Sequence, residues 1–183
     1  MHKRRPEDGS SMSFLDRLLG RGRVRDNEAM RPLYNALVGE ARDPAWYLKG
    51  GVPDTIDGRF EMVSAILSLV VARLELEVEQ RQNVAWLIEL FVDDMDGQLR
   101  EIGIGDMVVG KHMGRMMGAL GGRIGAYRDA LRDGSIEAAL VRNLYRETAP
   151  DPQALEFTAD RLRALYLGLH AAPSDRIVAG RLS

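Results

Sequence analysis

Acidic side chains are concentrated in residues 89–106, where carboxylates could hold a metal ion or act as general acids and bases. This segment contains six anions and one cation. A di-iron helical bundle needs Glu-x-x-His pairs on facing helices, and no such pair occurs in the sequence. An EF-hand loop needs alternating oxygen ligands around a glycine, and the run Asp94–Gly97 (DMDG) breaks that spacing. The segment therefore predicts an acidic surface, and we expect no metal site.

Motifs for nucleophilic catalysis and phosphate binding are also missing from the sequence. The chain has no cysteine, which excludes thiol catalysis, zinc ribbons and iron–sulfur clusters, and it has no Gly-x-Ser-x-Gly elbow. Gly103-Ile-Gly105 lacks the preceding strand and the third glycine of a dinucleotide loop. We therefore expect a protein that is not an enzyme and binds no cofactor. The alternative is an enzyme or cofactor binder that uses Asp93, Asp94, Asp96 and His112.

The composition is typical of one globular domain. The chain has 183 residues, 45% of them hydrophobic, and its 25 Lys and Arg nearly balance its 27 Asp and Glu. A general nucleic-acid binder would usually be basic overall. No apolar run reaches the roughly 20 residues that a membrane-spanning helix needs. Composition alone therefore indicates a protein of the cytoplasm without a general affinity for nucleic acid.

The two ends of the chain differ from its middle. Residues 1–25 hold seven cations and three anions, and Phe14–Leu19 has the pattern of a short helix. We expect a flexible basic N-terminal arm, which could contact an acidic partner or a lipid surface. Residues 26–171 form the predicted helical domain. Residues 172–183 form a C-terminal tail, and we expect the chain to fray from residue 171 onward.

Apolar residues recur every three or four positions along the helical domain, which is the period of a helix with one buried stripe. Long stripes occupy Phe60–Leu74, Val84–Leu99 and Val109–Leu131. The stretch Ala85–Val92 is apolar almost all round, so we expect the second long helix at the centre. No sustained alternation typical of strands occurs. The sequence therefore predicts an all-α, single-domain helical bundle of about seven helices.

Helix starts are indicated by capping residues and prolines. Two Asp-Pro pairs, at positions 43–44 and 151–152, combine a capping carboxylate with a proline in the first turn. Ser135 and Asp106 can cap two further helices. Pro32 interrupts a helical pattern, so it marks either a kink or a later helix start.

The third long helix carries an unusual number of glycines, spaced mainly at intervals of four. Each interior glycine costs about 1 kcal/mol of helix propensity relative to alanine. Close backbone packing against a neighbouring helix would offset this cost, and that neighbour could be internal or belong to a partner. The glycines are Gly110, Gly114, Gly118, Gly121, Gly122 and Gly125.

Charges also sort by helix. Residues 89–106 are acidic, whereas residues 111–132 hold five cations and one anion. The two helices could pair with each other inside the domain, or they could present separate acidic and basic patches to partners.

Two long strings resemble the signature of the ubiquinol–cytochrome c chaperone family. They are Gly51–Met62 (GVPDTIDGRFEM) and Asp93–Asp106 (DDMDGQLREIGIGD). Shorter matches occur in the same order, and the resemblance covers roughly Leu33 to Leu169. The shorter matches are Leu33-Tyr34, Ala41-Arg42-x-Pro44, Val109-Gly-Lys111, Met116 and Gly122-Arg123-x-x-Ala126-Tyr127.

The resemblance implies an all-α assembly factor for the ubiquinol–cytochrome c reductase (cytochrome bc1) complex of the respiratory chain. Mitochondrial members of the family are not enzymes; they bind newly made cytochrome b and act with a small partner protein near the exit of the mitochondrial ribosome. We therefore expect a chaperone for cytochrome b or another bc1 subunit, with the ribosome and a small partner protein as further candidates and no specific nucleic acid. Peripheral contact with the inner face of the respiratory membrane would suit this role. The alternative is a membrane-surface or ribosome-associated helical adaptor with a different client.

Two positions depart from the family pattern. Ala65-Ile66 stands where a Leu-His pair is expected, and Leu120-Gly121 stands where an aromatic pair is expected. If these positions touch a client or a partner, its recognition differs in this protein.

The matching motif positions define the candidate contact residues. The charged side chains of the turn Val52–Arg59 either fix the start of the next helix or form part of a partner surface. The candidates for binding a client or partner are Asp54, Asp57, Arg59, Phe60, Asp94, Asp96, Arg100, Glu101, Asp106, Lys111, Arg123 and Tyr127.

Overall fold

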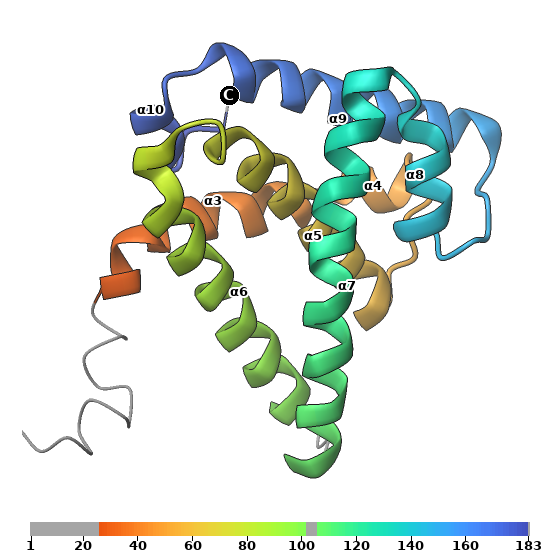
Figure 1. The fold of residues 1–183 in the computed structure, drawn as a ribbon. Helices are drawn as coiled ribbons and strands as arrows, with labels where there is room; N and C mark the ends of the chain where they lie inside the picture. Colours follow the sequence, from red (N-terminus) through yellow and green to blue (C-terminus); the bar gives the residue numbers. More distant parts are fainter. Residues whose placement is uncertain (1–25, 102–105, 183) are drawn as a thin grey trace, which may run out of the picture.

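The helices of this protein enclose one long central helix (Figure 1). The computed structural model describes the backbone of residues 26–101 and 106–182 and, within these ranges, all side chains except those of residues 99, 106–113 and 115–117. No residue in these ranges lies in a β-strand, and the predicted all-α fold is confirmed. The predicted arm with its short helix, residues 1–25, lies outside the described residues. The elements are η1 (Asn27–Met30), α3 (Arg31–Ala41), α4 (Pro44–Leu48), α5 (Ile56–Leu74), η2 (Val78–Gln80), α6 (Arg81–Glu101), α7 (Asp106–Asp133), α8 (Ile136–Asn143), α9 (Pro152–Ala171) and α10 (Ser174–Val178).

The central helix is α5, against which α3, α7 and α9 pack. Every residue from Phe60 to Leu74 is buried. Ser68 is tolerated in this helix because its small hydroxyl bonds to the backbone: Ser68 Oγ donates to the carbonyl of Ser64 at 2.7 Å. The prediction that Ala85–Val92 lies at the centre is wrong, because α6 leaves Ala85 exposed and packs against the core on one side only.

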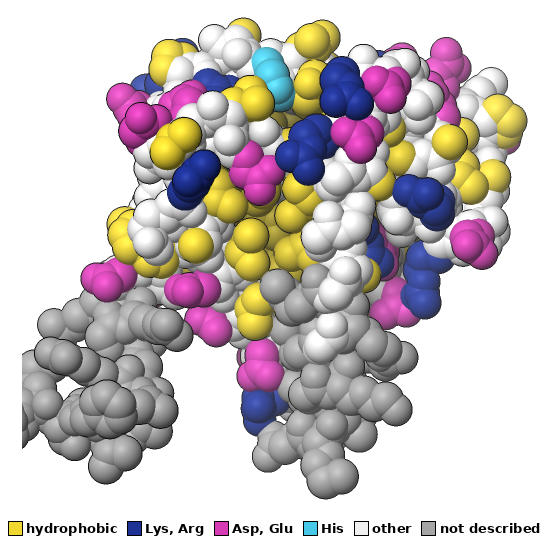
Figure 2. All heavy atoms as spheres, viewed as in Figure 1, with side chains coloured by type: hydrophobic (Ala, Val, Ile, Leu, Met, Phe, Trp, Pro, Cys, Tyr) yellow, Lys and Arg dark blue, Asp and Glu magenta, His cyan; other side chains and the backbone are white. Residues whose placement is uncertain are grey.

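Helices α6 and α7 converge where α6 ends and α7 begins, and they diverge toward their other ends (Figure 1). Apolar side chains gather on the face between the two helices (Figure 2). The first of the two alternatives, pairing of an acidic α6 with a basic α7, does not occur among the ion pairs of the described side chains. Arg123 of α7 pairs with Glu61 of α5, and Arg128 of α7 pairs with Glu75, just after α5.

Two of the predicted caps form side-chain hydrogen bonds, at the starts of α4 and α9. Asp43 Oδ1 accepts from the backbone N–H of Ala45 at 2.8 Å, and Asp151 Oδ1 accepts from that of Gln153 at 2.9 Å. Pro32 lies in the first turn of α3, so it marks a later helix start rather than a kink. Helix α8 begins directly after the predicted position 135, but the serine there makes no side-chain capping bond. Helix α7 begins at residue 106, whose side chain lies outside the described set.

The C-terminal residues pack on the core instead of fraying. Ile177 of α10 is fully buried and Leu182 is nearly so. The end of α9 is held by Arg73 of α5, whose guanidinium donates to the carbonyls of Leu169 and Ala172, each at 3.0 Å. Residue types do not show which backbone carbonyls accept a hydrogen bond from a distant side chain. The sequence from Pro173 onward therefore has the composition of a tail although it packs on the core.

The described glycines of α7 do not pack closely against a neighbouring helix of this domain. A Cβ atom built on any of them would meet nothing within 4 Å outside its own helix, so the interpretation of internal close packing is wrong for these positions. The glycines concerned are Gly114, Gly118, Gly121, Gly122 and Gly125.

Gly58, in the first turn of α5, is the helical glycine that the fold requires. A Cβ atom at this position would lie 2.0 Å from the carbonyl oxygen of Pro53. We expect Gly58→Ala to lower the free energy of unfolding in urea by about 2–3 kcal/mol, because the turn before α5 must shift. Gly39→Ala is the matched control, since its Cβ has open space and alanine adds up to about 1 kcal/mol of helix propensity. Equal effects of the two substitutions would contradict this explanation.

Candidate functional site

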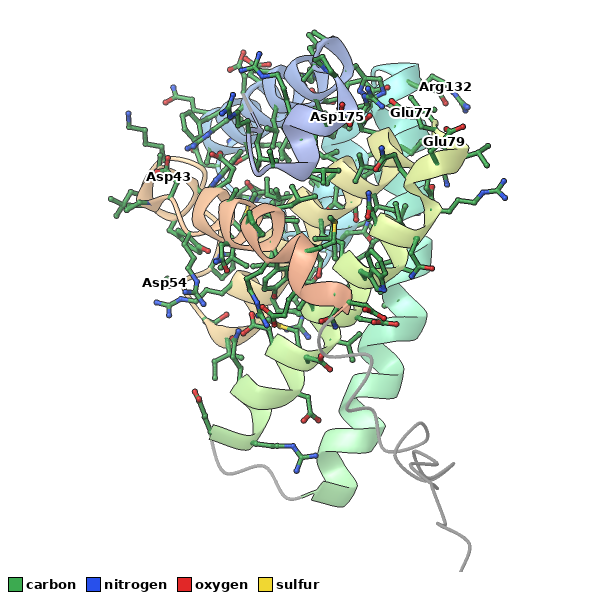
Figure 3. All side chains as sticks on the ribbon, turned by 90° about the vertical axis from the view of Figure 1, so that its left-hand side faces the viewer. Asp43, Asp54, Glu77, Glu79, Arg132 and Asp175 are labelled. Carbon is green, nitrogen blue, oxygen red and sulfur yellow. The ribbon has the colours of Figure 1, made fainter. Side chains whose placement is uncertain are left out.

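A groove of about 580 Å³ lies where the end of α3, helix α4, the start of α5 and the C-terminal half of α6 meet. Its walls are largely apolar and aromatic, and its rim carries both signs of charge. Asp43 and Asp54 project outward on this side of the molecule (Figure 3). The lining residues are Val38, Arg42, Pro44, Tyr47, Leu48, Asp54, Arg59, Phe60, Val63, Asp94, Met95 and Gln98.

Helix α4 forms the most exposed wall of the groove because its opposite face is anchored in the core. Trp46 is fully buried, and its indole N–H donates to the carbonyl of Glu40 at 2.8 Å. The guanidinium of Arg161, from α9, lies 4.2 Å from the centre of the indole ring. With Trp46 fixed, the next two residues face the groove, and Leu48 is left 84% exposed. An exposed leucine beside an open groove is available for an apolar contact.

The inner wall of the groove is aromatic and continues into α6. Phe60 is buried, and its ring centre lies 5.6 Å from that of Phe91. Met95, one turn further along α6, is also buried and lines the same wall. Flat rings and a thioether adapt to apolar side chains of different shapes. The wall therefore suits binding rather than a reaction.

Charged groups at the rim are held by short hydrogen bonds. Arg59 Nε donates to Asp54 Oδ1 at 2.6 Å, and this bond holds the pKa of the Asp54 carboxyl below its usual range. Asp94 Oδ2 accepts from the hydroxyl of Tyr34 at 2.7 Å and from the amide of Gln98 at 3.0 Å. Burial raises the pKa of Tyr34 above its usual range, so this phenol remains a donor.

A buried ion pair lies on the far side of Phe60. Arg123 Nη2 donates to Glu61 Oε1 at 2.6 Å, with side chains only 14% and 8% exposed. The same guanidinium lies 5.5 Å from the centre of the Phe60 ring. Tyr127, one turn further along α7, is buried beside the pair. Desolvation raises the pKa of Glu61 to about 7, outweighing the lowering effect of Arg123 and Arg146.

This raised pKa predicts a pH dependence of stability. The unfolded pKa is near 4.5 and the folded pKa about 7, so the folded state binds more protons between these values and stability falls as pH rises through them. We expect the difference in unfolding free energy between wild type and Glu61→Gln to change by on the order of 2 kcal/mol from pH 4.5 to 7. Urea titrations at several pH values measure it. Glu79→Gln, at an exposed site on η2, serves as the control, and a wild-type–Glu61→Gln difference that stays constant with pH would count against a buried, proton-binding Glu61.

Comparison with known families gives a match over most of the chain. A family model described as ubiquinol-cytochrome C chaperone matches residues 48–183. The chain belongs to this family. The fold is similar to the crystal structure of the Cbp3 homolog from Brucella abortus, with a TM-score of 0.74 and 29% sequence identity, over 91% of this chain and 94% of that one. A comparison with curated proteins returned no significant match.

Both long family strings contribute to the groove. Asp54, Arg59 and Phe60 come from the first string, and Asp94 comes from the second; all four are among the predicted contact residues, and all line the groove. Strings more than 30 residues apart in sequence meet because α5 and α6 lie against each other at this end of the chaperone. Residues of both strings therefore meet at the groove.

The other candidate residues lie elsewhere. Arg123 and Tyr127 belong to the buried cluster behind Phe60, and Asp57 forms an ion pair with Arg146. The remaining candidates on α6 and α7 lie away from the groove lining or outside the described side chains. Asp96 and Arg100 pair with each other at 2.6 Å along α6, Glu101 is exposed at its end, and the side chains of Asp106 and Lys111 are not among those described.

Several groove residues were not among the candidates. Tyr47 and Leu48 line the groove and follow the matched Arg42-x-Pro44 string in the sequence. One feature of the sequence could have identified them: a tyrosine and a leucine lie in a short predicted helix just before a glycine pair. Apolar side chains in such a short helix cannot all be buried.

Features of other protein classes are missing from the part of the chain that is described. In residues 26–101 and 106–182, no group of three or more described His, Asp or Glu side chains could hold a metal ion. None of the helices in those ranges is long and apolar enough to cross a membrane.

Proposed function

We propose that this protein is a non-enzymatic assembly chaperone of the cytochrome bc1 complex that holds a segment of newly made cytochrome b in the groove between α4 and α6. The observation that carries this proposal is the convergence of both family strings on that groove. An exposed Leu48 and the buried Phe60 provide apolar contacts. A rim with both signs of charge can bind the polar ends of such a segment.

The size of the groove limits what it can hold. A volume of about 580 Å³ is in the range of small-ligand pockets, so it accommodates a few client side chains rather than a folded domain. Short-segment binding suits a chaperone, because a client held by few contacts can be released to the assembling complex. Arg42 lines the groove and has no ion-pair partner among the described residues, so it is available to an acidic group of the client.

A gene deletion tests the proposal. In a strain that lacks the gene, we expect membranes to lose cytochrome b, heme b and quinol–cytochrome c reductase activity, and the wild-type gene to restore all three. Normal amounts of all three would mean that the client is another protein. A gene without the codons for residues 1–25, supplied to the same strain, tests the arm, because loss of ribosome or membrane co-sedimentation with normal cytochrome b would support an adaptor instead.

A further inference from the structure

Five buried polar atoms at the contact between α5 and α7 have no hydrogen-bond partner within the described part of the protein. Polar groups buried without a partner destabilise the state that buries them. Their concentration in one cluster singles out this contact from the otherwise apolar core. The atoms are Glu61 Oε2, Ser64 Oγ, Arg123 Nε, Arg123 Nη1 and Tyr127 Oη.

The ion pair within the cluster does not offset this cost. A single bond joins Glu61 and Arg123, whereas a buried pair is stabilising only when its remaining donors and acceptors are also bonded. Apolar residues of similar size often replace such pairs with no loss, or a gain, of stability. The α5–α7 contact is therefore weaker than an apolar contact of the same area would be.

The backbone of α7 is also easily deformed beside this cluster. Gly121, Gly122 and Gly125 flank Arg123, and none has a neighbour within 4 Å that a Cβ would meet. Glycine weakens a helix interior because it loses the most conformational freedom on ordering. Buried polar atoms without hydrogen-bond partners and a stretch of low helix propensity thus coincide within one turn of α7.

The cluster is connected to the groove through one side chain. The guanidinium of Arg123 lies over the ring of Phe60. Phe60 also lines the groove and packs on Phe91 of α6. A client side chain that displaces the Phe60 ring would also disturb the contact of Arg123.

We propose that Glu61, Arg123 and Tyr127 form a latch that lets the middle of α7 separate from α5 when the groove is occupied. The opening of the latch is a property of this chain alone, whereas its link to a client in the groove rests on the proposed function. The latch gives a reason for keeping a costly polar cluster where apolar residues would fit.

Hydrogen exchange of the purified full-length protein, followed by mass spectrometry, tests the latch. We expect peptides of α7 around residue 123 to exchange at least 100-fold faster than those of α5 in the wild type. The double variant E61L/R123M should slow exchange in α7 at least tenfold, and Tyr127→Phe should slow it several-fold. The matched control is E75L/R128M, an exposed pair between α7 and the residue that follows α5, which should change exchange less than twofold.

Two results would overturn the latch. One is wild-type exchange in α7 as slow as in α5. The other is faster exchange in Tyr127→Phe, because this would mean that the buried hydroxyl is bonded, for example to water. The link to the client is tested in the deletion strain, where E61L/R123M should restore less than half of the cytochrome b that the wild-type gene restores. Full restoration of cytochrome b by E61L/R123M would reject the link between the latch and the client. If the wild-type gene itself restored no cytochrome b, the proposed function would be rejected, and the hydrogen-exchange result would still test the latch.

Discussion

Leu48→Asp is expected to reduce the amount of cytochrome b that co-purifies with this protein at least tenfold while leaving the fold intact. Leu48 is 84% exposed at the edge of the groove, so its loss should change the unfolding free energy by no more than about 0.5 kcal/mol. Burying a leucine against a client contributes about 1.5–3 kcal/mol, and a carboxylate would also have to be desolvated. A loss of about 1.4 kcal/mol already corresponds to a tenfold change in affinity.

Leu167→Asp provides the matched control for this prediction. Leu167 is 65% exposed on α9 and does not line the groove. Both variants should show the same urea midpoint as the wild type, and only Leu48→Asp should lose co-purified cytochrome b. If the two variants retain equal amounts, the groove is not the client site.

The second large effect is expected at Trp46. We predict that Trp46→Ala lowers the free energy of unfolding by about 3–5 kcal/mol, because the substitution leaves a cavity and removes a bond to the carbonyl of Glu40. It also leaves the guanidinium of Arg161 without its aromatic partner. Helix α4 would then lose the anchor that holds its other face toward the groove. Urea unfolding measures the loss.

Trp86→Ala is the internal comparison for Trp46, since the chain has two tryptophans. Trp86 on α6 is only partly buried, so its removal should cost clearly less. An equal loss of stability in the two variants would mean that the buried indole does not anchor α4.

Local rules predicted two helix caps of this protein and the buried stripes of its long helices, but they did not predict which helix lies at the centre. The aspartates at positions 43 and 151 cap α4 and α9 as their sequence context indicates, because capping depends on residues only two positions away. The centre of the fold depends on contacts between distant segments. Helix α5 hides Ser64 and Ser68 completely, although both make its sequence look less buried than that of α6.

The sequence predicted only part of the candidate site, because the rest of the site also depends on contacts between distant segments. Family strings identified Asp54, Phe60 and Asp94, and the groove brings them together. The strings could not show that Arg123 approaches Phe60 from behind, because this depends on how α7 packs on α5. They also missed Leu48, which the structure singles out by its exposure beside the groove.

The glycines of α7 show how a correct pattern can support a wrong interpretation. Their spacing places them on one face of a helix, but it does not say whether another helix of the same domain covers that face. The structure leaves Gly114, Gly118 and Gly122 exposed. Glycine lowers the propensity for a helix interior, and no packing within the described part of this chain offsets that cost at these positions.

Site-specific crosslinking in growing cells tests the central claim most directly. A photoreactive amino acid would replace Leu48 at the groove in one strain and Leu167 on α9 in another, followed by identification of the crosslinked protein. We predict a crosslink to newly made cytochrome b from position 48 and none from position 167. Crosslinks to cytochrome b from position 167 alone, or to a different protein from position 48, would contradict the proposal that the groove holds cytochrome b.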